Sequence, residues 1–117
     1  MRILIVEDDA DVRDGLYQAL TSTGHDVFCA GDYSSAVSAA DAANPDVLIC
    51  DWQLDDPEGD GVDVARDVSE NRSVRVVMVT ARDLDELKAR VGDMPVAAYL
   101  RKPIGLINMF AVIDKLQ

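Results

Sequence analysis

The chain has 117 residues, and 49% of them are hydrophobic, which is enough to bury the core of one domain and excludes an intrinsically disordered protein. It carries 22 acidic and 11 basic residues, a formal net charge of −11, so direct binding to nucleic acid or to an anionic membrane surface is disfavoured. No apolar stretch approaches the roughly 20 residues of a transmembrane helix, and a strand-like run begins at the N-terminus without room for a signal peptide. We therefore expect a cytoplasmic protein.

Short apolar runs alternate with segments of helical periodicity along the whole chain. The expected strands are Ile3–Val6, Val27–Ala30, Asp46–Cys50, Arg75–Val79 and Val96–Arg101. The expected helices cover about residues 10–22, 34–43, 61–70, 84–91 and 104–116. This strict alternation predicts a parallel sheet with helices on both faces. Since no linker or repeat interrupts it, we expect residues 1–117 to form a single domain.

Several residues mark the ends of these elements. Asp9 and Asp83 are expected to cap the first and fourth helices, because a carboxylate can accept hydrogen bonds from the free N–H groups of a first turn. Gly24 is expected to end the first helix in a left-handed conformation. Asn44 precedes a proline and should end the second helix.

The two cysteines, Cys29 and Cys50, lie at the apolar ends of two predicted strands. A free cysteine is among the most buried residue types, so we expect both to be small buried thiols. No CxxC motif or His/Cys cluster is present, and a zinc site therefore has no support.

Polar side chains follow the expected strands at the points where these strands end. Glu7 and Asp8 follow the first strand, Asp51 the third and Thr80 the fourth, and Lys102 follows the fifth. Because the carboxyl ends of parallel strands share one edge of a sheet, these groups are expected to meet there. Three carboxylates, a hydroxyl and an ammonium suit a divalent cation together with a phosphoryl group.

Four short motifs carry a resemblance to a known family. They are Val6-Glu7-Asp8-Asp9, Cys50-Asp51-Trp52-Gln53-Leu54, Val79-Thr80-Ala81 and Tyr99-Leu100-Arg101-Lys102-Pro103. In this order, each after its own strand, they resemble the receiver domain of bacterial two-component response regulators over the whole chain. The resemblance implies a flavodoxin-like (βα)5 fold, a doubly wound parallel five-stranded sheet with strand order 2-1-3-4-5.

The resemblance also implies a metal-assisted phosphoacceptor site. Asp51 corresponds to the phosphoacceptor, since an aspartate can act as the nucleophile toward phosphorus. Asp8, Asp51 and the backbone carbonyl of Gln53 correspond to direct ligands of Mg²⁺ or Mn²⁺, and Glu7 acts through a water molecule. Mg²⁺ prefers oxygen ligands and keeps several waters, which agrees with so few carboxylates.

The remaining motif residues correspond to groups around the phosphate. Lys102 pairs with the phosphoryl oxygens, Thr80 donates its hydroxyl to one of them, and the small side chain of Ala81 leaves the phosphate room. Thr80 and Tyr99 form the switch: as Thr80 moves toward the phosphate, Tyr99 rotates and changes the neighbouring surface. The Lys102-Pro103 peptide bond is expected to be cis.

The partners that the resemblance implies are a sensor histidine kinase or a histidine phosphotransfer protein. The protein is then a switch rather than an enzyme with a diffusible product, and it catalyses only its own phosphotransfer and slow autodephosphorylation. The surface of the fourth helix, fifth strand and fifth helix is expected to contact a second copy or an output domain. The last helix has more apolar residues than one face needs, and Met109 and Val112 either are buried or contribute to such a contact.

The chain departs from the family pattern after Asp51. Position 55 is aspartate where the family has proline, and the loop before Gly61 is longer, with Pro57 as a substitute for the missing proline. An alternative function is that of a receiver-like protein-binding module that is never phosphorylated. A flavodoxin-like cofactor protein, or a phosphatase with its nucleophile after the first strand, is less favoured. No glycine-rich or serine/threonine-rich phosphate loop follows the first strand, and no Asp-x-Asp-x-Thr motif is present.

Overall fold

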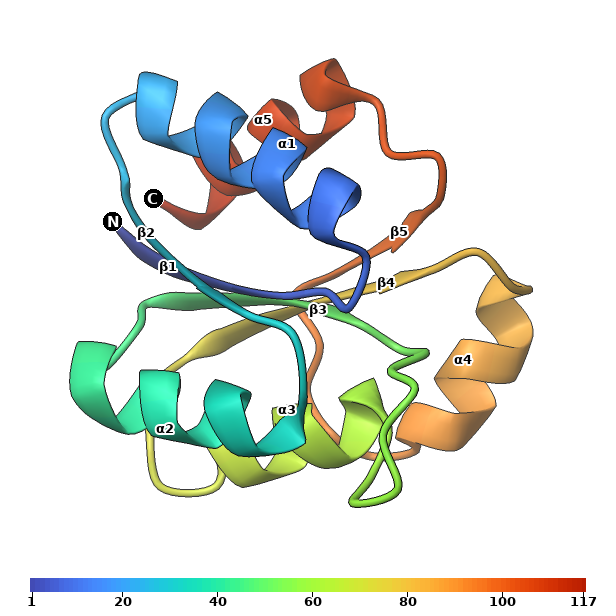
Figure 1. Cartoon of the computed structure of the whole chain (residues 1–117). Helices are drawn as coiled ribbons and strands as arrows, with labels where there is room; N and C mark the ends of the chain where they lie inside the picture. The colour runs from blue at the N-terminus through green and yellow to red at the C-terminus, as the bar shows by residue number, and fades with distance from the viewer.

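The computed structural model describes all residues, Met1–Gln117, as five strands that alternate with five helices (Figure 1). The strands are β1 (Arg2–Val6), β2 (Asp26–Ala30), β3 (Val47–Asp51), β4 (Arg75–Thr80) and β5 (Ala98–Arg101). The helices are α1 (Ala10–Ser22), α2 (Tyr33–Ala43), α3 (Gly61–Ser69), α4 (Leu84–Val91) and α5 (Leu106–Leu116). Every predicted element is present, with end residues that differ by one or two positions, as is usual for element boundaries.

All five strands are parallel and lie in the order β2-β1-β3-β4-β5, which confirms the predicted fold class. The register brings the carboxyl ends of the strands to one edge of the sheet. Val6 pairs with both Ala30 and Cys50, and Asp51 pairs with Val79. The side chains that directly follow β1, β3, β4 and β5 are therefore neighbours, although they are far apart in the sequence.

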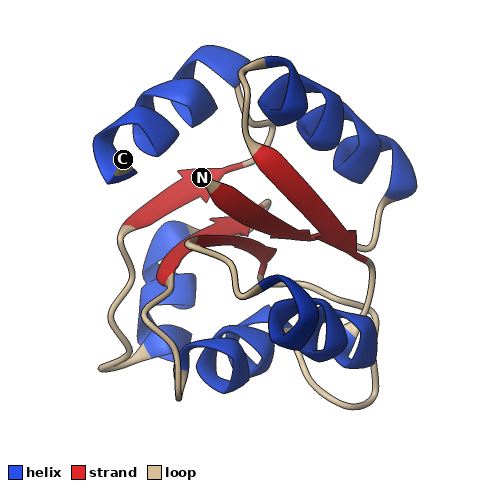
Figure 2. Cartoon of the chain, turned by 90° about the vertical axis from the view of Figure 1, so that its left-hand side faces the viewer, coloured by secondary structure: helices blue, strands red, loops and turns tan.

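Helices cover both faces of the sheet (Figures 1 and 2). Alternate residues of a strand point to opposite faces, so β1 contributes Ile3 and Ile5 to one core cluster and Leu4 and Val6 to the other. The first cluster lies beneath α1 and α5, and the second lies beneath α2, α3 and α4. The central strand β3 is buried throughout.

Side-chain caps define most of the helix starts. Asp9 accepts hydrogen bonds from the first-turn amides of α1, and Asp83 does the same for α4, as predicted. The second helix begins one residue earlier than predicted, because Asp32 and Ser35 form a reciprocal capping box around its first turn. Gly24 has the predicted positive φ, 90°.

The prediction that both cysteines are buried was wrong for Cys29. Cys50 lies on the covered central strand β3 and is fully buried, whereas Cys29 is exposed on β2. β2 is an edge strand with a neighbour on one side only, and Phe28 beside Cys29 is also exposed. Composition alone does not distinguish such an edge strand from a central one.

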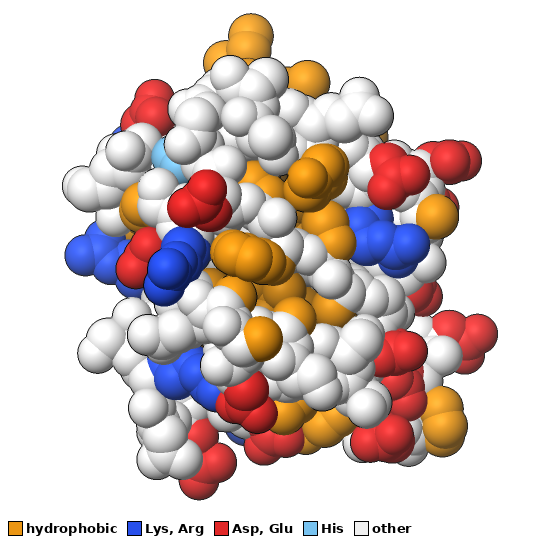
Figure 3. Space-filling model, turned by 60° about the vertical axis from the view of Figure 1, so that its left-hand side comes forward, with side chains coloured by type: hydrophobic (Ala, Val, Ile, Leu, Met, Phe, Trp, Pro, Cys, Tyr) orange, Lys and Arg blue, Asp and Glu red, His pale blue; other side chains and the backbone are white.

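The structure decides between the two expectations for Met109 and Val112 of α5, which were burial or a contact with a partner. Met109 is fully buried in the core, and Val112 is half-buried against it, so burial accounts for these two side chains. The exposed apolar residues of this helix are instead Leu106 and Ile107 in its first turn, at 48% and 84% exposure. Elsewhere, hydrophobic side chains reach the surface in the middle of the side shown in Figure 3, and acidic groups lie along its right-hand border as well as on its left and lower parts. None of the helices has the length and apolar character required to cross a membrane.

Candidate functional site

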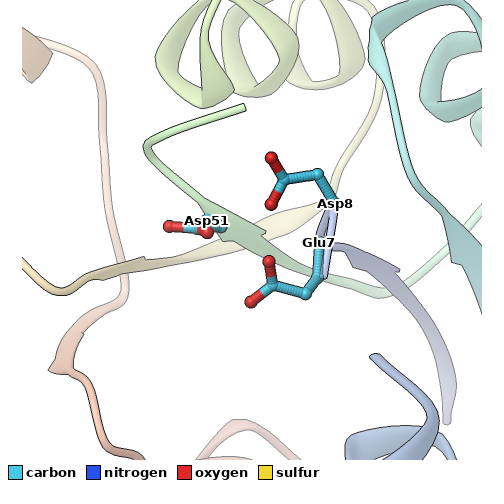
Figure 4. Close-up of side chains that lie close together, drawn as sticks. All are labelled: Glu7, Asp8 and Asp51. Atoms are coloured by element: carbon cyan, nitrogen blue, oxygen red, sulfur yellow. The ribbon is translucent and has the colours of Figure 1, made fainter. Parts of the chain in front are cut away.

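Three acidic side chains meet at the carboxyl edge of the sheet. Glu7 and Asp8 follow β1, and Asp51 ends the adjacent strand β3 (Figure 4). One carboxylate oxygen from each of the three lies within 4.8 Å of the other two. Glu7 and Asp51 are only 2% and 7% exposed, whereas Asp8 is open to solvent. Such a set of hard oxygen donors, closed on one side and open on the other, fits Mg²⁺ with several of its waters retained.

Lys102 connects two of these acids from the loop after β5. Its Nζ lies 2.9 Å from Asp51 Oδ2 and also donates a hydrogen bond to Glu7 Oε1. Its backbone N–H donates to the carbonyl oxygen of Thr80 at 2.8 Å, which fixes the loop against the end of β4. The Lys102-Pro103 peptide bond is cis, as predicted.

Burial, hydrogen bonds and neighbouring charges together change the pKa of two members of this cluster. Burial raises the pKa of the Glu7 carboxyl, and the hydrogen bond from Lys102 opposes this rise only in part. For Lys102, burial acts to lower the pKa, but hydrogen bonds to Glu7 and Asp51 and their negative charges outweigh it and raise the pKa. The lysine therefore stays charged at neutral pH and compensates the buried carboxylates.

Backbone amides hold the carboxylates in place. Asp9 N–H donates to Glu7 Oε2 at 3.2 Å, and Gln53 N–H donates to Asp51 Oδ1 at 3.3 Å. Asp8 Oδ2 accepts from the N–H of Asp55 at 3.2 Å. Asp9 itself is occupied as the α1 cap, as the sequence predicted.

Thr80 ends β4 next to the acidic cluster, since its predecessor Val79 pairs with Asp51. It is fully buried, and its Oγ1 accepts a hydrogen bond of 2.9 Å from the N–H of Arg82. The hydroxyl proton has no acceptor within the protein, so it remains available for a ligand. Ala81 and Lys102 both line a groove of about 530 Å³ that extends from this edge between α1 and the start of α5.

Tyr99 lies on β5 opposite Met78 of β4, on the sheet face covered by α2, α3 and α4. Its ring is half-buried, and the ammonium of Lys88 on α4 lies 5.4 Å from the ring centre. Burial raises the pKa of its phenol. The structure thus places Tyr99 between the core and α4 rather than at the acidic cluster.

The loop that follows Asp51 closes back on the acceptor. Gly61, the first residue of α3, donates its N–H to the carbonyl oxygen of Trp52 at 2.7 Å. A side-chain carbon at this glycine would lie 1.7 Å from the carbonyl oxygen of Asp51, so only glycine allows α3 to begin here. The longer loop is therefore compatible with a compact site.

The sequence analysis missed an ion-pair network beside the acceptor. Trp52 Nε1 donates to Asp60 Oδ2 at 3.1 Å, and the guanidinium of Arg90 binds Asp60 at 3.1 Å and Asp63 at 2.9 Å. This network joins the residue after Asp51 to the end of α4. No local spacing rule pairs Arg90 with Asp60, because the contact depends on how α4 packs beside α3.

The family model of the response regulator receiver domain matches residues 3–114. Among curated proteins, the transcriptional regulatory protein PdtaR of Mycobacterium tuberculosis is 33% identical over 114 residues, which cover 97% of this chain and 55% of the relative. The phosphate regulon transcriptional regulatory protein PhoB of Escherichia coli is 35% identical over 115 residues, covering 96% of this chain and 49% of the relative. The chain thus spans about half the length of these two proteins.

Solved structures agree with this match to the receiver domain family. The signal receiver domain of a modulated diguanylate cyclase from Desulfovibrio desulfuricans is 26% identical, with a TM-score of 0.84 and coverage of 98% of this chain and 91% of the other. The N-terminal domain of a three-domain response regulator/sensory box/GGDEF protein from Carboxydothermus hydrogenoformans has a TM-score of 0.88 at 22% identity. It covers 99% of this chain and 93% of that domain, and at this identity it supports the fold alone.

Proposed function

This chain belongs to the response regulator receiver domain family, and we propose that it is a phosphorylation-activated signalling switch with Asp51 as its phosphoacceptor. One observation carries the proposal: the Asp51 carboxylate lies within 4.8 Å of two other acids and 2.9 Å from the ammonium of Lys102. A single aspartate is thus surrounded by the charges that phosphoryl transfer requires.

In the proposed reaction, a carboxylate oxygen of Asp51 attacks the phosphorus of a phosphohistidine on a sensor histidine kinase or phosphotransfer protein. The new oxygen–phosphorus bond forms as the phosphorus–nitrogen bond breaks, and the electron pair of that bond returns to the imidazole. Hydrolysis of the aspartyl-phosphate by water later resets the switch. The protein positions the reacting groups and supplies the charges around them, and it acts as a switch rather than as an enzyme that makes a diffusible product.

We assign a magnesium site, which Mn²⁺ could also occupy, to Asp8, Asp51 and the backbone carbonyl of Gln53. When bound, the cation would supply positive charge that offsets the negative charge of the incoming phosphoryl group. Glu7 is held by Lys102 and by the amide of Asp9, an arrangement that suits contact through a water molecule. The three carboxylates repel one another, and a cation relieves this repulsion.

Thr80 and Lys102 are proposed to bind the phosphoryl oxygens, beside the small side chain of Ala81. The Thr80 hydroxyl proton is available for this bond, and Lys102 can transfer its hydrogen bonds from the carboxylates to the phosphate. Movement of Thr80 would leave space that Tyr99 fills. Because Tyr99 lies against Lys88 of α4, its rotation would alter the surface of α4, β5 and α5, where a second copy or an output domain would bind.

The groove beside Lys102 suits the approach of the kinase. It begins at Ala81 and Lys102 in the acceptor site and continues along Val12, Gly15 and Leu16 of α1 to Leu106. We propose that the helix bearing the phosphohistidine lies along this groove, because a donor there would present its imidazole to Asp51. This surface is mostly apolar and continuous with the reacting groups.

Phosphorylation by acetyl phosphate in the presence of Mg²⁺ tests the assignment of Asp51. The unsubstituted protein should gain one phosphoryl group, and the Asp51→Ala variant should gain none. If the unsubstituted protein also gains no phosphoryl group, although it binds a sensor kinase, the alternative of a protein-binding module that is never phosphorylated would be correct.

A further inference from the structure

A main-chain hydrogen bond links the loop after the acceptor to the most exposed of the three acids. The N–H of Asp55 donates to Asp8 Oδ2 at 3.2 Å, across 47 positions of sequence. Asp8 is open to solvent, unlike Glu7 and Asp51, so burial does not restrict its side-chain rotation. The Asp55 amide is the hydrogen-bond donor that contacts the Asp8 carboxylate.

The Asp55 amide is itself held in a defined place. The preceding side chain, Leu54, is buried in the core beneath α2, α3 and α4. The following residue, Asp56, donates its N–H to the Leu54 carbonyl at 2.9 Å and accepts from the N–H of Tyr33 at 2.8 Å. The loop is thus fixed on both sides of Asp55, whereas the Asp55 side chain is exposed and makes no hydrogen bond.

We propose that the main-chain N–H of Asp55 is a positioning group for the metal site and sets its affinity for Mg²⁺ by holding the Asp8 carboxylate toward Asp51. This inference rests on the proposed magnesium site. A carboxylate has two oxygens with several lone pairs, so it can accept from the amide and still bind a cation. Hydrogen bonds that orient a metal ligand in this way typically contribute 10- to 100-fold to metal affinity.

The residue type at position 55 therefore matters for a reason unrelated to its carboxylate. Any residue except proline supplies an N–H here, and proline removes it. The resemblance noted above places proline at this position in the family, so the departure to aspartate adds an amide donor to this site. In this chain the proposed effect on Mg²⁺ affinity comes from the backbone N–H, and the side chain of Asp55 has no part in it.

Two substitutions separate the backbone from the side chain. Asp55→Ala removes the carboxylate and keeps the N–H, whereas Asp55→Pro removes both. Mg²⁺ affinity is measured for both variants and for the unsubstituted protein by isothermal titration calorimetry and by Trp52 fluorescence. Asp55→Ala should bind Mg²⁺ within about twofold of the unsubstituted protein, and Asp55→Pro should bind roughly tenfold more weakly.

Equal Mg²⁺ affinity in the two variants would overturn the inference and leave the proposed function intact. Failure of the unsubstituted protein itself to bind Mg²⁺ would overturn both. A second measurement does not depend on the folding of the proline variant. In the amide NMR spectrum, the Asp55 proton should move upfield in Asp8→Ala, while that of Glu58, which donates to Asp56, stays in place; an unmoved Asp55 proton would also overturn the inference.

Discussion

The ammonium of Lys102 lies 2.9 Å from the carboxylate of Asp51, although the two residues are 51 positions apart in the sequence. The contact exists because β3 and β5 flank β4 in the sheet and end at the same edge. The same ammonium also binds Glu7, the residue that directly follows β1. One flexible cation therefore serves two buried carboxylates, and it can exchange either of them for a phosphoryl oxygen.

Removal of the Glu7 charge should make the metal-free protein more stable at neutral and alkaline pH. The raised pKa of Glu7 means that the folded protein holds this proton more tightly than the unfolded chain does. The free energy of unfolding therefore falls as the pH rises from the ordinary glutamate range through the raised pKa, and it stays lower above it. Urea denaturation in EDTA at a series of pH values measures this effect. At pH 8 the free energy of unfolding of Glu7→Gln should be higher than that of the unsubstituted protein.

That advantage should disappear as the pH falls below the ordinary pKa of glutamate, about 4.3, where both proteins carry a neutral group. Saturating Mg²⁺ should reduce or reverse it at pH 8, because the cation stabilises the protein that binds it more tightly. A pH-independent difference between the two proteins would contradict the assignment of the raised pKa to Glu7.

Thr80→Val should separate phosphorylation from switching. Valine retains the shape of this fully buried side chain but removes the hydroxyl proposed to follow the phosphate. We expect the variant to accept phosphate at Asp51 without the change around Tyr99 and α4. The amide NMR signals of β5 and α4, compared with and without beryllofluoride and Mg²⁺, measure that change.

Thr80→Ser is the matched control, since it keeps the hydroxyl and should keep the response. A full response of α4 in Thr80→Val would show that the hydroxyl is not what couples the phosphate to Tyr99.

Filling the groove beside Lys102 should weaken binding of the kinase without changing phosphorylation of Asp51 by a small phosphate donor. Gly15 lies in α1 on this groove, and a side-chain carbon added to it meets no atom within 4 Å. Gly15→Leu should therefore fold normally, gain about 1 kcal/mol from the better helix former, and accept phosphate from acetyl phosphate as before. Phosphotransfer from autophosphorylated sensor kinases of the source organism should fall.

Gly15→Ala provides the control, because it gives a similar gain in helix stability and leaves the groove open. Equal kinase phosphotransfer to the alanine and leucine variants would place the kinase contact elsewhere.

The sequence was sufficient to predict the fold and the position of each polar group at the sheet edge. Alternating apolar runs and helical segments specified β1 to β5, and the side chains after each strand had to share an edge once the sheet was parallel. The caps at Asp9 and Asp83 followed from local chemistry, and the strand order and the cis bond before Pro103 came from the resemblance.

Features that depend on packing between distant segments were not predictable in this way. The exposure of Cys29 depends on β2 being an edge strand, and the bond from Asp55 to Asp8 depends on how the loop is folded. The contact of Arg90 with Asp60 likewise requires the end of α4 to lie beside the start of α3. None of these follows from residue spacing.

The most direct test of the switch is the mass of the intact protein after incubation with acetyl phosphate and Mg²⁺, followed by peptide mapping. The account predicts a gain of one phosphoryl group on Asp51. This gain should not occur when EDTA is present during the incubation or when Asp51 is replaced by alanine. Normal phosphoryl incorporation in Asp51→Ala, or incorporation that is indifferent to EDTA, would contradict it.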